Sequence, residues 1–136
     1  MRISASVRNA GRNHRATVRT AGQSQELSIN ARASGQGSSV NGGELLMLAL
    51  ATCYCNDIYR EAARLGLQVD SVEVEAQADF EGIGLAARNI SYRARVESAA
   101  PEADIDELLR QTDAVAEIQN TVRAGAKISR LPWRVA

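Results

Sequence analysis

Three segments near the start of the chain alternate apolar and polar residues. The apolar positions are Ile3, Ala5 and Val7, then Ala16 and Val18, then Leu27, Ile29 and Ala31. Turn-forming stretches at 11–14 and 21–24 separate these segments. Because a period of two puts alternate side chains on one face of a strand, the pattern predicts three antiparallel strands with one buried face.

An almost unbroken apolar run follows at 43–55. As a helix, its first two turns have no polar face, which is typical of a helix inside a core or a membrane. The run has about half of the roughly 20 residues that a membrane span needs. We therefore expect a buried central helix from about Gly43 to Leu65, capped at its start by Asn41 and ended by a left-handed Gly66.

The second half of this helix mixes polar and apolar positions. The polar residues are Asp57, Arg60, Glu61 and Arg64, and the apolar ones are Ile58, Ala62 and Leu65. This pattern predicts an amphipathic helix with one polar and one apolar face.

Two later segments, 72–80 and 90–96, alternate in the same way and are joined by a turn at 81–84. They predict a β-hairpin. Carboxylates on the polar face of the first strand match guanidiniums on the second, and such cross-strand pairs favour one register.

The last third of the chain predicts two helices and a strand. Asp104 and Glu107 have the spacing of a capping box that opens a helix, and a shorter helix is expected to end near Gly125. A last edge strand is predicted at 128–131, before Pro132. The order of elements predicts an α+β fold with antiparallel sheet.

Length and charge narrow the possible domain organisation and the possible partners. A chain of 136 residues fits a single domain, 1–136. Its 16 basic and 16 acidic side chains cancel, so no global field favours nucleic acid or an anionic membrane as a partner. The first residues lack the apolar core of a signal peptide. We therefore expect a cytoplasmic protein whose cysteines are free rather than bridged.

Both cysteines, Cys53 and Cys55, lie in the apolar run. Two positions apart on a helix, their side chains diverge by about 200°, which does not fit the geometry of a disulfide. The same divergence argues against a metal site formed with His14. No metal and no cofactor are expected.

Several segments together match a known pattern. They are the Gly-rich loop at 32–43, Asn41-Gly42-Gly43-Glu44-Leu45-Leu46, Ala49-Leu50-Ala51-Thr52-Cys53, the Leu65-Gly66-Leu67 break, Val72-Glu73-Val74, and 118–123 near the end. In these residues, and in the order of its elements, the chain resembles the OsmC/Ohr family of osmotically inducible and organic hydroperoxide resistance proteins. The resemblance covers nearly the whole chain.

The resemblance implies an OsmC-like fold, an intertwined homodimer in which sheets wrap around paired central helices with sites at the subunit interface. It also implies thiol-dependent reduction of organic hydroperoxides. A thiolate on the central helix becomes a sulfenic acid, a second cysteine resolves it, and an external dithiol reduces the resulting disulfide. In peroxidase members an Arg from the N-terminal hairpin and a Glu at the helix start accompany the thiolate.

Carried over by position, Cys53 is the nucleophile. The resolving cysteine falls at Ala116 and is absent. The usual Glu falls at Gly43, and Glu44 lies one position later, about 100° round the helix.

The Arg of the peroxidase members falls near Asn13, which is flanked by Arg12 and Arg15. Either arginine could serve if the register shifts slightly.

Two functions remain open. The first is a cysteine-based peroxidase in which Cys53 is the nucleophile, with Arg12 or Arg15 as its cation, Glu44 beside them, and Cys55 as a resolving thiol or a bystander. The second is a non-catalytic dimer of the same fold. It would bind a small apolar molecule in an interface cleft near Met47, Leu50 and Tyr54.

Overall fold

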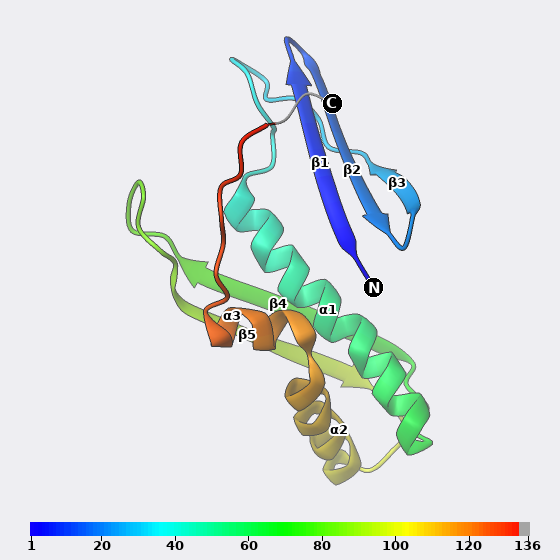
Figure 1. The fold of residues 1–136 in the computed structure, drawn as a ribbon. Helices are drawn as coiled ribbons and strands as arrows, with labels where there is room; N and C mark the ends of the chain where they lie inside the picture. The colour runs from blue at the N-terminus through cyan, green and yellow to red at the C-terminus, as the bar shows by residue number, and fades with distance from the viewer. Residues whose placement is uncertain (134–136) are drawn as a thin grey trace. The chain divides into compact units, whose positions relative to one another are not determined.

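The structure of the chain is a computed structural model that describes residues 1–133 (Figure 1). Its elements are β1 Ile3–Ala10, β2 Asn13–Thr20, β3 Gln23–Leu27, α1 Gly42–Leu65, β4 Ser71–Asp79, β5 Arg88–Glu97, α2 Glu102–Val115 and α3 Glu117–Ala124. The chain divides into two compact units, Met1–Leu45 and Leu46–Ala136. That both fold together as one domain remains a prediction from chain length.

The first unit holds a three-stranded antiparallel sheet in the order β1-β2-β3. Val7 pairs with Ala16 and Ala5 with Val18, so the predicted apolar residues of the first two strands do share a face. Within this unit no second layer covers that face, and Val7 is 65% exposed.

The predicted third strand was wrong in its position. It was expected to run from Leu27 to Ala31, whereas β3 ends at Leu27. Ala21 and Gly22 both have positive φ, 50° and 84°, which makes a two-residue hairpin turn of the kind that matches the twist of its strands. Gln23 therefore pairs with Thr20 at once, and the strand uses residues that had been assigned to the turn.

Both ends of α1 are fixed as the sequence predicts. The Asn41 side chain accepts a hydrogen bond from the Glu44 amide at 2.8 Å, and the Glu44 carboxylate accepts one from the Asn41 amide at 3.0 Å. This reciprocal pair is a capping box. At the other end Gly66 has φ 71°, and the Leu67 amide donates to the Ala62 carbonyl at 2.8 Å, as in a Schellman cap.

The second unit has two layers, with helices on the apolar face of the β4–β5 hairpin (Figure 1). Its core joins Tyr54, Ile58 and Ala62 of α1 to Leu108 of α2 and to Ala116. Against this cluster pack the inward side chains of the hairpin, Val72, Val74, Tyr92, Ala94 and Val96. The core of this unit is thus built on one face of one long helix.

The hairpin has the predicted register. Glu75 lies opposite Arg93, and Glu73 lies opposite Arg95. Both pairs form ion pairs on the solvent face, the first at 2.6 Å. Exposed pairs of this kind add little stability, so their main effect is on register.

Two predictions in the last third of the chain were wrong. Asp104 does not cap α2, because the helix begins earlier, after Pro101, and has no side-chain cap. No strand forms at 128–131, where Ile128 is 98% exposed and no neighbouring strand pairs with it in the described chain. The short helix α3 was predicted correctly and ends at a left-handed Gly125, φ 62°.

The burial of α1 differs from the sequence pattern in two ways. Leu48, in the apolar run, is 60% exposed in the single chain. Conversely, Asp57 and Glu61 are 5% and 7% exposed, although they had been assigned to a polar face. Both carboxylates fall at helical spacing from Tyr54, so they share its buried face.

No helix of the described chain is both long enough and apolar enough to cross a membrane.

Tyr54 ties α1 to α2 and makes the stability of the fold sensitive to alkaline pH. Its hydroxyl donates to the Leu109 carbonyl at 2.7 Å, and burial, aided by Asp113, raises its pKa from 10.0 to about 12. The unfolded chain ionises this hydroxyl at lower pH than the folded chain does. The stabilisation is therefore complete below pH 10 and is lost as the pH rises toward about 12.

We expect Tyr54→Phe to lower the free energy of unfolding by about 1 kcal/mol at neutral pH, because one hydrogen bond is lost. We also expect it to flatten the alkaline decline in stability. Urea unfolding at neutral pH and at alkaline pH measures both effects. Tyr59→Phe is the matched control, since Tyr59 is 44% exposed. An unchanged alkaline decline in Tyr54→Phe would contradict the assignment.

Candidate functional site

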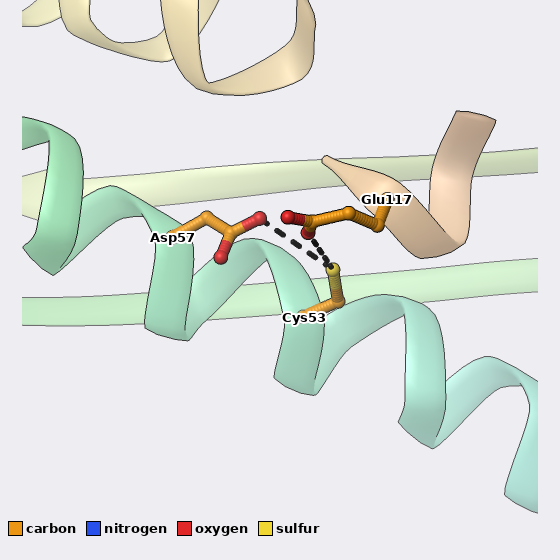
Figure 2. Close-up of side chains that lie close together, drawn as sticks. All are labelled: Cys53, Asp57 and Glu117. Atoms are coloured by element: carbon orange, nitrogen blue, oxygen red, sulfur yellow. Dashed lines mark hydrogen bonds between the residues drawn. The ribbon is translucent and has the colours of Figure 1, made fainter. Parts of the chain in front are cut away.

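Cys53 lies on α1 one helical turn before Asp57, in a small polar cluster (Figure 2). Its Sγ is 3.6 Å from Oδ2 of Asp57 and 4.0 Å from Oε2 of Glu117. Glu117 is the first residue of α3. The structure thus joins two residues of one helix to a third that is distant in sequence.

The junction between α2 and α3 positions Glu117. Ala116 has an extended backbone, φ −73° and ψ 104°, and it separates the two helices. Its side chain is completely buried in the core. The break places the start of α3 beside Cys53, where the Ile118 backbone amide lowers the pKa of the thiol. The position predicted for a resolving cysteine therefore directly precedes a residue that contacts Cys53.

Burial and the two carboxylates favour the protonated form of Cys53. Burial raises the pKa of the Cys53 thiol, the Ile118 amide opposes that rise, and Asp57 and Glu117 add to it. Burial likewise raises the pKa of Asp57, while Arg60 lowers it. A thiol beside a partly buried carboxylate has a proton acceptor within reach but no net positive neighbourhood.

Arg60 is the cation of this cluster. Its Nη1 lies 3.0 Å from Oδ1 of Asp57 and 3.9 Å from Oε1 of Glu117. It therefore bridges the two carboxylates whose other oxygens face the sulfur.

Cys53, Asp57 and Glu117 also offer three ligand atoms within 4.8 Å of one another. Thiolate and carboxylate are ligand types that divalent metals accept. Since Arg60 already pairs with both carboxylates, the cluster has a cation partner of its own.

Three of the other predicted site residues, Arg12, Arg15 and Glu44, lie in the first unit and have partners there. Arg12 donates to the Ala33 carbonyl at 2.7 Å, Arg15 pairs with Glu26 at 3.3 Å, and Glu44 belongs to the helix cap. Their placement against Cys53 stays a prediction. Cys55 is free and half-buried, as is Cys53.

A cavity of about 550 Å³ lies in the second unit between α1, β5, α2 and α3. Leu50 and Tyr54, two of the three predicted cleft residues, line it. Met47 is not among the lining residues. Gln119 also lines the cavity, and sequence analysis missed it because nothing in a short amphipathic helix marks one glutamine as buried.

Asp57 and Glu117 were missed as well. Asp57 carried a usable signal, since the spacing from Cys53 to Asp57 places both on neighbouring turns of one helix face. Glu117 carried none, because its contact depends on the bend at Ala116.

The sequence pattern of the OsmC-like protein family matches residues 35–130. This chain belongs to the OsmC-like family. Its fold is shared by the OsmC-like protein of Mycoplasma pneumoniae, with a TM-score of 0.63 at 15% identity over 90% of this chain and 86% of that one. It is also shared by an organic hydroperoxide resistance protein from Elizabethkingia anophelis, with a TM-score of 0.62 at 15% identity over 90% and 89% of the two chains.

A third similar structure is the organic hydroperoxide resistance protein OhrB of Bacillus subtilis, with a TM-score of 0.55 at 18% identity over 90% of this chain and 91% of that one. Comparison with curated proteins finds no match. The structural relatives thus show an α+β OsmC-type fold.

We expect Asp57→Asn to lower the pKa of Cys53 in this OsmC-family protein, because the substitution removes a negative charge and a hydrogen-bond acceptor at the thiol. Each unit of pKa changes the thiolate fraction about tenfold. The rate of iodoacetamide alkylation against pH, measured in a Cys55→Ser background, reports on Cys53 alone.

Glu61→Gln is the matched control, because Glu61 is similarly buried but pairs with Arg64, and at 3.8 Å with Arg60, rather than with Cys53. A Cys53 alkylation profile that is the same in Asp57→Asn, Glu61→Gln and the parent would refute a role for Asp57 in holding the proton.

Proposed function

We propose that this OsmC-family protein reduces organic hydroperoxides, with Cys53 as the nucleophile. The observation that carries the proposal is the 3.6 Å contact between Cys53 Sγ and Asp57 Oδ2 on α1, which lies beside Glu117 of α3. The thiolate is the reactive form of cysteine, and this contact gives the thiol a base that can accept its proton during attack.

In the proposed reaction Asp57 accepts the thiol proton while the Cys53 sulfur attacks the outer oxygen of a hydroperoxide, ROOH. The O–O bond breaks, and the proton passes to the leaving alkoxide. The products are the alcohol ROH and the sulfenic acid of Cys53. The raised pKa of Asp57 suits this role, because a stronger base takes a thiol proton more readily.

An external thiol completes the cycle in the proposal. It condenses with the sulfenic acid, releases water and forms a mixed disulfide, which a second thiol group then reduces to restore Cys53. An external dithiol supplies both groups. Ala116 provides no internal thiol, and Cys55 points to another side of α1, so external resolution is the route that this chain favours.

Arg12 or Arg15 supplies a second cation in the proposal. The resemblance places such an arginine near the thiolate, and both residues lie in the β1–β2 hairpin region of the first unit. Arg60 bridges the carboxylates and is already committed to them. A further positive group would offset the carboxylates and stabilise the thiolate.

The proposal includes a homodimer. In the single chain, Ile3 and Val7 are each 65% exposed and Leu48 is 60% exposed. Large apolar side chains in such number are typical of surfaces that a second copy covers. Light scattering is expected to give twice the chain mass of 14.6 kDa, and a monomer at all concentrations would contradict a dimer.

We place the reaction in the cytoplasm. Both cysteines are free, and free thiols persist in a reducing compartment.

We expect Cys53→Ser to abolish the consumption of cumene hydroperoxide in the presence of dithiothreitol, because the nucleophile is lost. Cys55→Ser is the matched control and should keep most of the activity. The ferrous-xylenol orange assay follows the remaining peroxide. Equal, negligible rates in the parent and in Cys53→Ser would end the peroxidase proposal.

The second candidate function is non-catalytic binding of a small apolar molecule. The cavity lined by Leu50 and Tyr54 favours it. Binding that persists in Cys53→Ser, together with a parent protein inert toward peroxide, would support this function over the first.

A further inference from the structure

The cavity of the second unit has the size and the lining of a small-molecule site. Its volume of about 550 Å³ falls in the usual range for ligand pockets, about 300–1,000 Å³. Leu50 and Tyr54 of α1, Tyr92 and Ala94 of β5 and Val122 of α3 give it an aromatic and aliphatic lining. Tyr54 and Tyr92 meet edge to face, with ring centroids 4.7 Å apart, which fixes one wall.

Gln119 adds one unpaired polar atom to this lining. The residue is 3% exposed. Its Nε2 donates to the Leu50 carbonyl at 2.9 Å, which fixes the orientation of the amide. Within residues 1–133 the other atom, Oε1, is buried and has no hydrogen-bond partner. Buried polar groups are nearly always paired. No donor among the described residues satisfies this oxygen, so we look for one outside them.

The charged side chains of the lining and the Tyr54 hydroxyl are already paired. The Tyr54 hydroxyl donates to the Leu109 carbonyl. Arg123 pairs with Asp113 at 2.6 Å, and Arg93 pairs with Glu75. The guanidinium charges at the rim are thus neutralised, so the cavity favours neither an anion nor a cation. Among the uncharged polar groups of the lining, Oε1 of Gln119 is a buried acceptor without a partner in the described chain, and the Ser91 hydroxyl is a second polar group.

We propose that this cavity binds a neutral aromatic or aliphatic molecule that carries one hydroxyl group, and that the hydroxyl donates its hydrogen bond to Oε1 of Gln119. This assigns a chemical class of ligand to the second candidate function and a specificity-determining residue to the cavity. Cys53 is not among the lining residues. The binding therefore does not depend on the peroxidase chemistry, and a failure of one leaves the other intact.

The test compares two probes that differ only in the donor, 4-tert-butylphenol and 4-tert-butylanisole. Both are titrated into the ¹⁵N-labelled full chain carrying Cys53→Ser, and amide chemical shifts give the dissociation constants. We expect the phenol to bind about fivefold more tightly than the ether, which corresponds to one hydrogen bond of ordinary strength. The largest shifts are expected in β5 and α3.

Gln119→Met removes the acceptor and keeps the length of the side chain. In this variant the two probes should bind equally. Gln77→Met makes the same chemical change on β4, outside the cavity lining, and should keep the fivefold difference. If Gln119→Met does not fold, Val122→Phe replaces it, because it fills the cavity while leaving Gln119 in place and should weaken both probes.

Three results would overturn the proposal. They are equal affinities of the two probes for the Cys53→Ser chain, shifts confined to residues outside the cavity, and no binding of either probe up to its solubility limit. In the first case the acceptor is satisfied by water and does not select the ligand.

Discussion

The second unit depends on the burial of one face of α1 against the β4–β5 hairpin and α2. Tyr54, Ile58 and Ala62 form this contact at helical spacing, and the apolar side chains of the two strands meet it with a period of two. Burying such a face contributes about 25 cal/mol for each Å² removed from water, whereas the ion pairs on the opposite face of the hairpin contribute little. The caps at Asn41 and Gly66 set the length of α1, so they also set which residues reach the core.

The same buried face carries the chemistry. Cys53 and Asp57 lie beside the core residues on successive turns of α1, and the extended Ala116 brings the start of α3 against them. Two effects then oppose one another at the sulfur. The amide of Ile118 favours a thiolate, whereas burial and two carboxylates favour the thiol. In the proposed peroxidase the second effect holds the cysteine in its less reactive form until a base, a substrate and a further cation act together.

The cluster around Cys53 and the cavity around Gln119 are thus built on the same helices from different residues. The polar cluster at Cys53 and the cavity at Gln119 lie along α1 and α3, and Leu50 links them because its carbonyl fixes Gln119. A thiol needs a charged neighbourhood to react, while an apolar ligand needs a dry one with a single donor or acceptor. Because Cys53 does not line the cavity, each environment forms around its own residues. The similarity to organic hydroperoxide resistance proteins is one of fold, so the chemistry of both features stays a proposal.

Much of the fold follows from local patterns that need no knowledge of distant contacts. The alternation in β1, β2, β4 and β5 and the caps of α1 were predicted because spacing and side-chain type decide them. The third strand was misplaced because a two-residue turn at Ala21 and Gly22 started it early. The last strand failed because an apolar residue forms a strand only where another strand pairs with it, and Ile128 has none in the described chain.

The candidate site was likewise predictable from the sequence only in part. The sequence by itself determined the family, the position of Cys53 on the long helix α1, and two of the residues that line the cavity. Only the tertiary structure decided that Asp57 is buried beside the thiol, that Glu117 and Arg60 join it, and that Gln119 has an unpaired oxygen. The reason is physical: a helical period shows which residues share a face, but the charge and the hydrogen-bond partners around an atom depend on elements far apart in the sequence, here joined by the bend at Ala116.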